Sequence, residues 1–91
     1  MAGTKKPASR TYRSSARTRP SVPGALKRLG VRVRALREEH GLTQESAAER
    51  AHLDAKHWQE IEAGRVNVTL ASLVGIGKAL SVPLAKLFEG V

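Results

Sequence analysis

The side chains that could carry out catalysis or hold a metal ion are few and poorly spaced in this sequence. It has no cysteine, and its three histidines are His40, His52 and His57. His52 and His57 lie five positions apart across an expected helix start, a poor spacing for a shared metal ion, and no thiolate is present to complete a site. Most serines and threonines lie near the N-terminus, where no rigid base would activate a nucleophile. We therefore expect no enzyme, no metal and no other cofactor.

The polar side chains between residues 43 and 64 can recognise a ligand without breaking a bond. The segment predicts two short helices joined by a tight turn at residues 52–53. Thr43 is expected to cap the first helix, because a threonine hydroxyl can accept a bond from an unpaired amide at a helix start. The small residues that would let another helix approach closely are Ala47, Ala48 and Ala51.

The second short helix of this segment is expected to begin after Asp54, a residue type common at helix N-caps. Trp58 and Ile61 lie three positions apart, which predicts a buried stripe on one face. Gly64 follows the last helical residues, and glycine suits the left-handed conformation that often ends a helix. The segment thus predicts a helix, a turn and a second helix with a defined buried face.

This layout resembles the helix-turn-helix of the Cro/C1-type (XRE-like) repressor family over roughly residues 29–89. The residues that carry the resemblance are Gln44, Ala48, Ile61, Glu62, Gly64, Leu87 and Phe88. Three positions depart from the family pattern: His52 replaces the usual turn glycine, Ala47 replaces a larger aliphatic residue, and Gly77 stands where alanine is common. The resemblance implies an all-α, five-helix Cro/C1 repressor-like domain that binds double-stranded DNA.

In a helix-turn-helix, the second helix lies in the major groove with its N-terminal residues against the base edges. The resemblance places base-reading side chains at Ala55, Lys56 and Glu60, and Gln59 is added to this group. Lys56 can donate to O6 and N7 of guanine, Ala55 can contact the thymine methyl, and Glu60 can accept from N4 of cytosine. Two alternatives stay open. Lys56 could touch phosphate alone or nothing, and Glu60 could pair with Lys56 one turn away.

Contacts to the DNA backbone are expected from the start of the first short helix and from the loop after the second. The residues assigned to phosphate contacts are Gln44, His57, Arg65, Asn67 and Thr69. The resemblance also implies an internal ion pair between Arg37 and Glu62. Trp58 is interpreted as a core residue and not as a platform for base stacking.

Three further helices must position this segment. The first is expected over about residues 24–40 with Gly41 as its stop, the fourth after Thr69, and a short fifth after Pro83. One face of the first helix carries Leu26, Leu29, Val33 and Leu36. The residues of the fourth helix expected to face inward are Leu70, Leu73, Ile76 and Leu80, and the apolar face of the fifth carries Leu84, Leu87 and Phe88.

The net charge of +8 is concentrated at the N-terminus. Residues 1–24 hold six basic side chains and no acidic one, while the other ten basic residues accompany eight acidic ones. Residues 1–23 are therefore predicted to be a disordered basic arm and residues 24–91 the helix-turn-helix domain. Arg17 and Arg19 are candidates to enter an adjacent minor groove. A merely solubilising tail and an organelle transit peptide remain alternatives for the arm.

No apolar run is long enough to cross a bilayer, and no secretory signal segment opens the chain. We therefore expect a cytoplasmic, nucleoid-associated protein. The favoured function is sequence-specific DNA binding as a transcriptional repressor, acting as a homodimer on a near-palindromic operator. The candidate dimer residues are Leu84, Leu87, Phe88 and Val91, which could instead close the monomer core. The rival is an adaptor, coactivator or antitoxin that binds a protein partner while its basic tail holds nucleic acid non-specifically.

Overall fold

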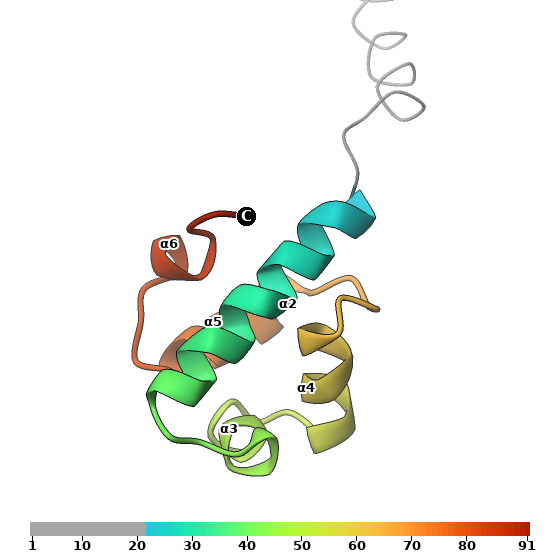
Figure 1. The fold of residues 1–91 in the computed structure, drawn as a ribbon. Coiled ribbons are helices and arrows are strands. Elements are labelled where there is room, and N and C mark those ends of the chain that lie inside the picture. The colour runs from blue at the N-terminus through green and yellow to red at the C-terminus, as the bar shows by residue number, and fades with distance from the viewer. Residues whose placement is uncertain (1–21) are drawn as a thin grey trace, which may run out of the picture.

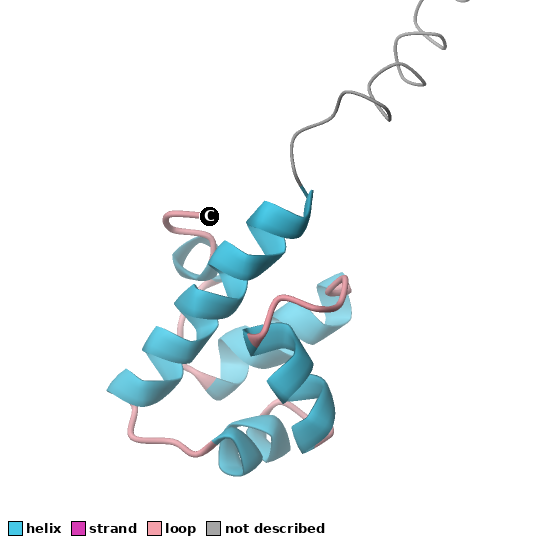
Figure 2. Cartoon of the chain, turned by 45° about the vertical axis from the view of Figure 1, so that its right-hand side comes forward, coloured by secondary structure: helices cyan, strands magenta, loops and turns pink. Residues whose placement is uncertain are grey.

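The computed structural model describes residues 22–91, so the predicted arm, with Arg17 and Arg19, lies outside the described residues except for positions 22 and 23. The described part folds into helices without a strand (Figures 1 and 2), as the all-α prediction requires. The helices are α2 (Val22–Glu39), α3 (Gln44–Arg50), α4 (Ala55–Glu62), α5 (Leu70–Ala79) and α6 (Leu84–Leu87).

Helix α2 is the long diagonal element in Figure 1 and supplies one wall of the core. Leu29, Val33 and Leu36 are buried, as their spacing along the sequence predicts. The helix begins at Val22, two residues before the expected start, with Pro23 in its first turn. Proline is tolerated there because its missing N–H would have no partner inside the helix.

The shorter helices pack around α2 and around one another. Helix α2 contacts α4 and α6, α3 contacts α4 and α5, and α5 also contacts α6. Ala47, Ala48 and Ala51 are buried, so the small-residue face of α3 lies inside the domain as predicted. The largest fully buried side chains are Trp58, Ile61, Ile76, Leu80, Leu87 and Val33. The core thus joins both helices of the helix-turn-helix to the rest of the domain.

One predicted inward residue is wrong: Leu70 is 67% exposed. Leu70 opens α5 and, at about 100° of rotation per residue, lies roughly 120° around the axis from the buried Ile76. Helical periodicity is a poor guide at the first position of a helix. Phe88, which was placed on the apolar face of the fifth helix and among the candidate dimer residues, is 44% exposed and follows the last residue of α6.

Four of the helices end in the same hydrogen-bonded arrangement, in which the residue after the C-cap adopts a left-handed conformation. These residues are Gly41, His52, Gly64 and Ser81, with φ of 66°, 59°, 72° and 56°. In each case its N–H and the next N–H bond back to carbonyls of the last turn, as Arg65 N does to Glu60 O at 3.0 Å. The predicted helix ends at Gly41 and Gly64 are confirmed. At His52 the turn forms without glycine.

Candidate nucleic-acid interface

The start of α3 is held by a reciprocal cap. Thr43 Oγ1 accepts the Ser46 N–H at 3.0 Å, and Ser46 Oγ accepts the Thr43 N–H at 3.2 Å. The cap at Thr43 was predicted, whereas the return bond through Ser46 was not. Because two otherwise unpaired amides are satisfied in this way, the first turn of α3 has a defined position. Gln44 is the first residue of that turn.

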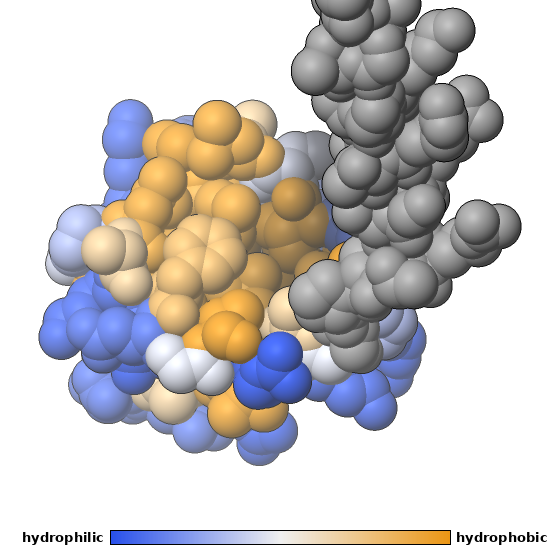
Figure 3. Space-filling view, turned by 90° about the horizontal axis from the view of Figure 1, so that it is seen from above, coloured by the Kyte–Doolittle hydropathy of each residue, from blue (hydrophilic) through white to orange (hydrophobic). Residues whose placement is uncertain are grey.

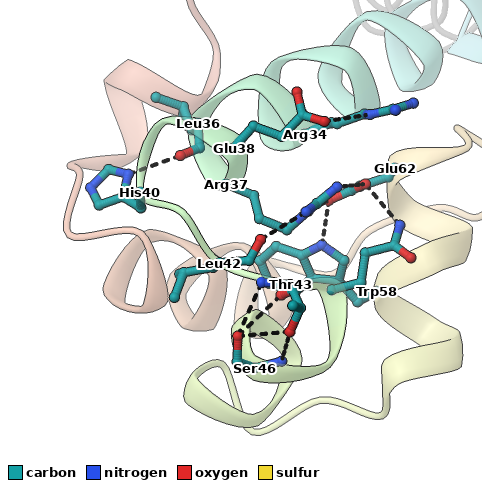
Figure 4. Close-up of polar contacts among 11 residues, drawn as sticks. Arg34, Leu36, Arg37, Glu38, His40, Leu42, Thr43, Ser46, Trp58 and Glu62 are labelled. Atoms are coloured by element: carbon teal, nitrogen blue, oxygen red, sulfur yellow. Dashed lines mark hydrogen bonds and ion pairs between the residues drawn. The ribbon is translucent and has the colours of Figure 1, made fainter.

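A single buried carboxylate joins α2, α3 and α4 (Figure 4). Arg37 donates to Glu62 from Nε at 2.6 Å and from Nη2 at 3.2 Å, so the predicted ion pair is confirmed. Trp58 donates its indole Nε1–H to Glu62 Oε2 at 2.5 Å, and Gln44 donates from Nε2 to Glu62 Oε1 at 2.9 Å. The two helices of the helix-turn-helix are therefore tied to each other and to α2 through Glu62.

The surroundings of Glu62 favour its ionised form. Burial alone would raise the pKa of this carboxyl, but hydrogen bonds from Arg37, Trp58 and Gln44 outweigh burial and hold its pKa below the ordinary range. The hydrogen bond to Glu62 also raises the pKa of the Arg37 guanidinium, against the effect of its own burial. The Glu62 side chain is 4% exposed, so the charge stays inside the domain.

Trp58 lies in the core, as predicted, and is fully buried together with Ile61 on one side of α4. The hydrogen bond from its N–H to a carboxylate was not predicted, although the spacing of four between Trp58 and Glu62 places them on one helix face. The bond between Gln44 and Glu62 was also missed. Gln44 keeps a second amide hydrogen, because a side-chain amide has two donors.

The predicted base-reading residues share the other side of α4. Lys56 and Gln59 are exposed, and Ala55 and Glu60 are half-buried. At about 100° per residue these four span roughly 140° of the helix surface, opposite the buried stripe. Asp54 occupies the N-cap position as predicted, but its side chain makes no capping hydrogen bond.

Glu60 has a partner that the sequence did not indicate. Arg65 donates from Nη1 to Glu60 Oε2 at 2.7 Å. The alternative pairing of Glu60 with Lys56 is wrong, and Lys56 makes no ion pair with any residue in the described part of the chain. The side chain of Lys56 therefore remains available to an external acceptor.

The other predicted phosphate contacts differ in how they are held. Asn67 is exposed in the loop after α4, and His57 is half-buried on α4. The Thr69 hydroxyl caps α5, accepting the Ser72 N–H and donating to Ser72 Oγ, each at 3.0 Å. Thr69 is thus already engaged in the fold, whereas the Asn67 side chain has no hydrogen-bond partner among residues 22–91.

Apolar side chains gather around α6 on the face shown in Figure 3. Phe88 is exposed, and Leu84 and Val91 are half-buried, but Leu87 is fully buried in the monomer. Leu87 is therefore a core residue and has no surface to offer a second copy. A hollow of about 450 Å³ lies beside this face, lined by Val74, Gly77, Lys78, Ser81, Val82 and Leu84.

Residues 22–91 contain no group of three or more metal-ligating side chains. Over the same residues, no helix has the length and apolar character needed to span a bilayer.

Comparison with known proteins places this arrangement in a family. The protein-family model described as a helix-turn-helix domain matches residues 28–87 of this chain. The control protein C.MunI from a Mycoplasma species is 37% identical over 65 residues, covering 70% of this chain and 88% of that protein. The immunity repressor protein of Bacillus phage phi105 is 35% identical over 57 residues, covering 63% of this chain and 40% of the repressor.

Among solved structures, the restriction-modification controller protein C.AhdI from Aeromonas hydrophila matches with a TM-score of 0.68 and 35% identity. The match covers 69% of this chain and 96% of C.AhdI. A variant of the controller protein C.Esp1396I matches with a TM-score of 0.67 and 33% identity, over 72% of this chain and 86% of the controller. The chain therefore belongs to the helix-turn-helix domain family and is a DNA-binding transcriptional regulator of the Cro/C1 type, not an enzyme.

Proposed function

We propose that this regulator is a repressor that binds a near-palindromic operator as a homodimer and works in the cytoplasm, on the nucleoid. Two copies related by two-fold symmetry would place their α4 helices in successive major grooves, about one helical turn apart. Occupation of the operator would then block access to a promoter.

The observation that carries the proposal is the division of α4 into two sides. One side, with Trp58 and Ile61, is fixed in the core, while Lys56 and Gln59 are exposed on the other. Glu62 binds Gln44, so the start of α3 has a fixed position relative to this surface. Base recognition requires exposed polar side chains on a rigid helix, and phosphate binding suits the start of a second helix next to it.

The dimer contact is proposed at the apolar surface of α6, formed by Leu84, Phe88 and Val91. Phe88 is one of the few large apolar side chains exposed in the described residues, and the hollow between α5 and α6 lies next to this surface. A second copy of the chain would remove both from water, which is favourable for apolar area.

The test is selection of bound duplexes from a random DNA pool at near-physiological salt. Enrichment of an inverted repeat with half-sites about one turn apart would support the proposal. Lys56→Ala should then lose roughly 1–3 kcal/mol of discrimination at one base pair in each half-site. Lys27→Ala, a matched change of an exposed lysine on α2, should leave the base preference as it is.

The contrary result is binding without an enriched sequence that simply weakens as salt rises. Such binding would come from charge alone, because each neutralised phosphate releases a counterion irrespective of sequence. The repressor proposal would then be wrong, and the adaptor function would take its place.

A further inference from the structure

Arg65 is attached to Glu60 at two points. Its backbone N–H bonds to the Glu60 carbonyl at 3.0 Å, and its Nη1 bonds to Glu60 Oε2 at 2.7 Å. The first bond belongs to the helix end that Gly64 makes possible with a φ of 72°. The turn therefore returns Arg65 to the residue five positions before it, and the guanidinium lies against the carboxylate.

This pair adds little to the stability of the fold. The Arg65 side chain is 67% exposed and the Glu60 side chain 29% exposed. Exposed ion pairs typically add little to the stability of a protein, because water screens them and two long side chains lose freedom. Its main consequence is therefore local, in the charge and orientation of Glu60 on the exposed side of α4.

An isolated carboxylate is poorly suited to a surface that meets DNA, since the phosphates repel it. Arg65 neutralises that charge and holds the carboxylate by Oε2. Glu60 Oε1 has no hydrogen-bond partner within residues 22–91, nor do Nε and Nη2 of Arg65. The pair can thus accept one hydrogen bond at a base edge and donate others to a phosphate at the same time.

We propose that Arg65 is a positioning residue for base recognition, holding Glu60 so that its free oxygen accepts from the exocyclic amine of cytosine. The inference rests on the proposed function, since it requires α4 to lie in the major groove. It assigns Arg65 a role in specificity in addition to the phosphate contact expected from its place in the loop. A lone phosphate contact would strengthen binding to every sequence equally.

The experiment measures the affinity of the full chain for the selected operator and for variants at the one base pair that depends on Glu60. Glu60→Ala identifies that base pair. Arg65→Ala should reduce the preference there by roughly tenfold, the scale of one good base contact, and should also lower overall affinity. Asn67→Ala is the matched control, because Asn67 is exposed in the same loop and has no bond to Glu60. It should lower affinity without changing the preference.

The double variant Glu60→Ala, Arg65→Ala should show the same base preference as Glu60→Ala alone, because the two residues act as one unit. Thermal unfolding of each variant checks that the fold is intact. If Arg65→Ala lowers affinity equally on every sequence, as Asn67→Ala does, the positioning role is wrong while operator binding stands. If the unaltered protein has no base preference at all, the proposed function itself fails, and this inference with it.

Discussion

Glu62 occupies a position where four donors from three side chains meet one carboxylate: two from Arg37 and one each from Trp58 and Gln44. No buried side-chain nitrogen or oxygen in the described part of the chain lacks a partner. A fully satisfied polar group of this kind fixes the relative placement of helices, whereas loss of one partner leaves a buried charge unpaired. The ionised Glu62 therefore helps to set the mutual position of α3 and α4, together with the core residues that pack between these helices.

The stability of the fold should depend on pH through Glu62. Because the folded-state pKa of Glu62 lies below its unfolded value of about 4.3, its contribution to stability is present above that pH. This stabilising contribution of Glu62 is lost as the pH falls from about 4.3 through the lower folded-state pKa. Trp58→Phe, which removes one donor and keeps an aromatic ring, should lower the free energy of unfolding at pH 7 by about 1.5–3 kcal/mol.

The difference between Trp58→Phe and the unaltered protein should narrow as the pH falls below about 4.3. Urea denaturation followed by circular dichroism from pH 7 to pH 3 measures it. Glu49→Gln, an exposed change on α3, serves as the control and should differ little from the unaltered protein throughout. A Trp58→Phe deficit that stays constant over this range would mean that Trp58 acts through packing alone.

His52 is the second residue whose local geometry has a measurable consequence. Its φ of 59° is left-handed, which is unfavourable for a residue with a Cβ by about 1–2 kcal/mol. His52→Gly should raise the free energy of unfolding by about 0.5–1 kcal/mol, since the greater freedom of glycine in the unfolded chain offsets part of the gain. Chemical denaturation measures the change. His52→Ala keeps the Cβ and should give no such gain; equal stabilisation by both substitutions would refute the explanation.

At the scale of the elements, the contact between α2 and α4 depends on the absence of a side chain at Gly30. A Cβ built there would overlap the Glu62 carbonyl oxygen and lie 2.7 Å from the Ile61 carbonyl oxygen. Both are backbone atoms, so neither can move without shifting α4. Gly30 thus allows the close approach on which the position of the base-reading helix depends.

Gly30→Ala should lower the free energy of unfolding by about 1–3 kcal/mol, the usual range for overfilling a packed site. Intrinsic helix preference acts in the opposite direction, because alanine exceeds glycine by about 1 kcal/mol in a helix. A lower free energy of unfolding would show that overfilling of the α2–α4 contact dominates, whereas a higher one would show that helix preference dominates. Val31→Ala, at the next and 68% exposed position of α2, is the control and should change stability by less than about 0.5 kcal/mol.

The local elements could be predicted from sequence because their signals are local. Thr43, Gly41 and Gly64 each act within one helical turn, and the Trp58–Ile61 stripe follows from spacing alone. The Arg37–Glu62 pair was expected from family resemblance, not from the residues themselves. The bond from Gln44 to Glu62 spans 18 positions, and no local pattern reports which side chains meet after three helices pack. Arg65 was missed as a partner of Glu60 because the chain first reverses at Gly64.

At the scale of the whole molecule, the proposed dimer gives two neighbouring residues different roles: Phe88 would contact the second copy, whereas Leu87 stabilises the monomer. Phe88→Glu places a charge on the exposed apolar surface and should yield a folded monomer. Leu87→Ala removes a fully buried side chain and should destabilise the monomer by about 2–5 kcal/mol. Analytical ultracentrifugation with and without operator DNA measures whether each variant is a monomer or a dimer. A monomer in both states for the unaltered protein would refute the dimer.

The charge distribution of the whole chain gives the last prediction. Residues 1–21 carry six basic side chains and no acidic one, so they hold most of the net charge of +8. If α4 reads the bases, removal of residues 1–21 should weaken binding to all sequences alike. The slope of log affinity against log salt should become shallower by about 0.9 for each phosphate that the removed charges had neutralised. The ratio of affinities for operator and unrelated DNA should persist, because that ratio depends on Lys56 and its neighbours in the groove. If the truncated protein keeps its fold but binds no DNA, the arm supplies the whole affinity and the helical domain is left to bind a protein partner.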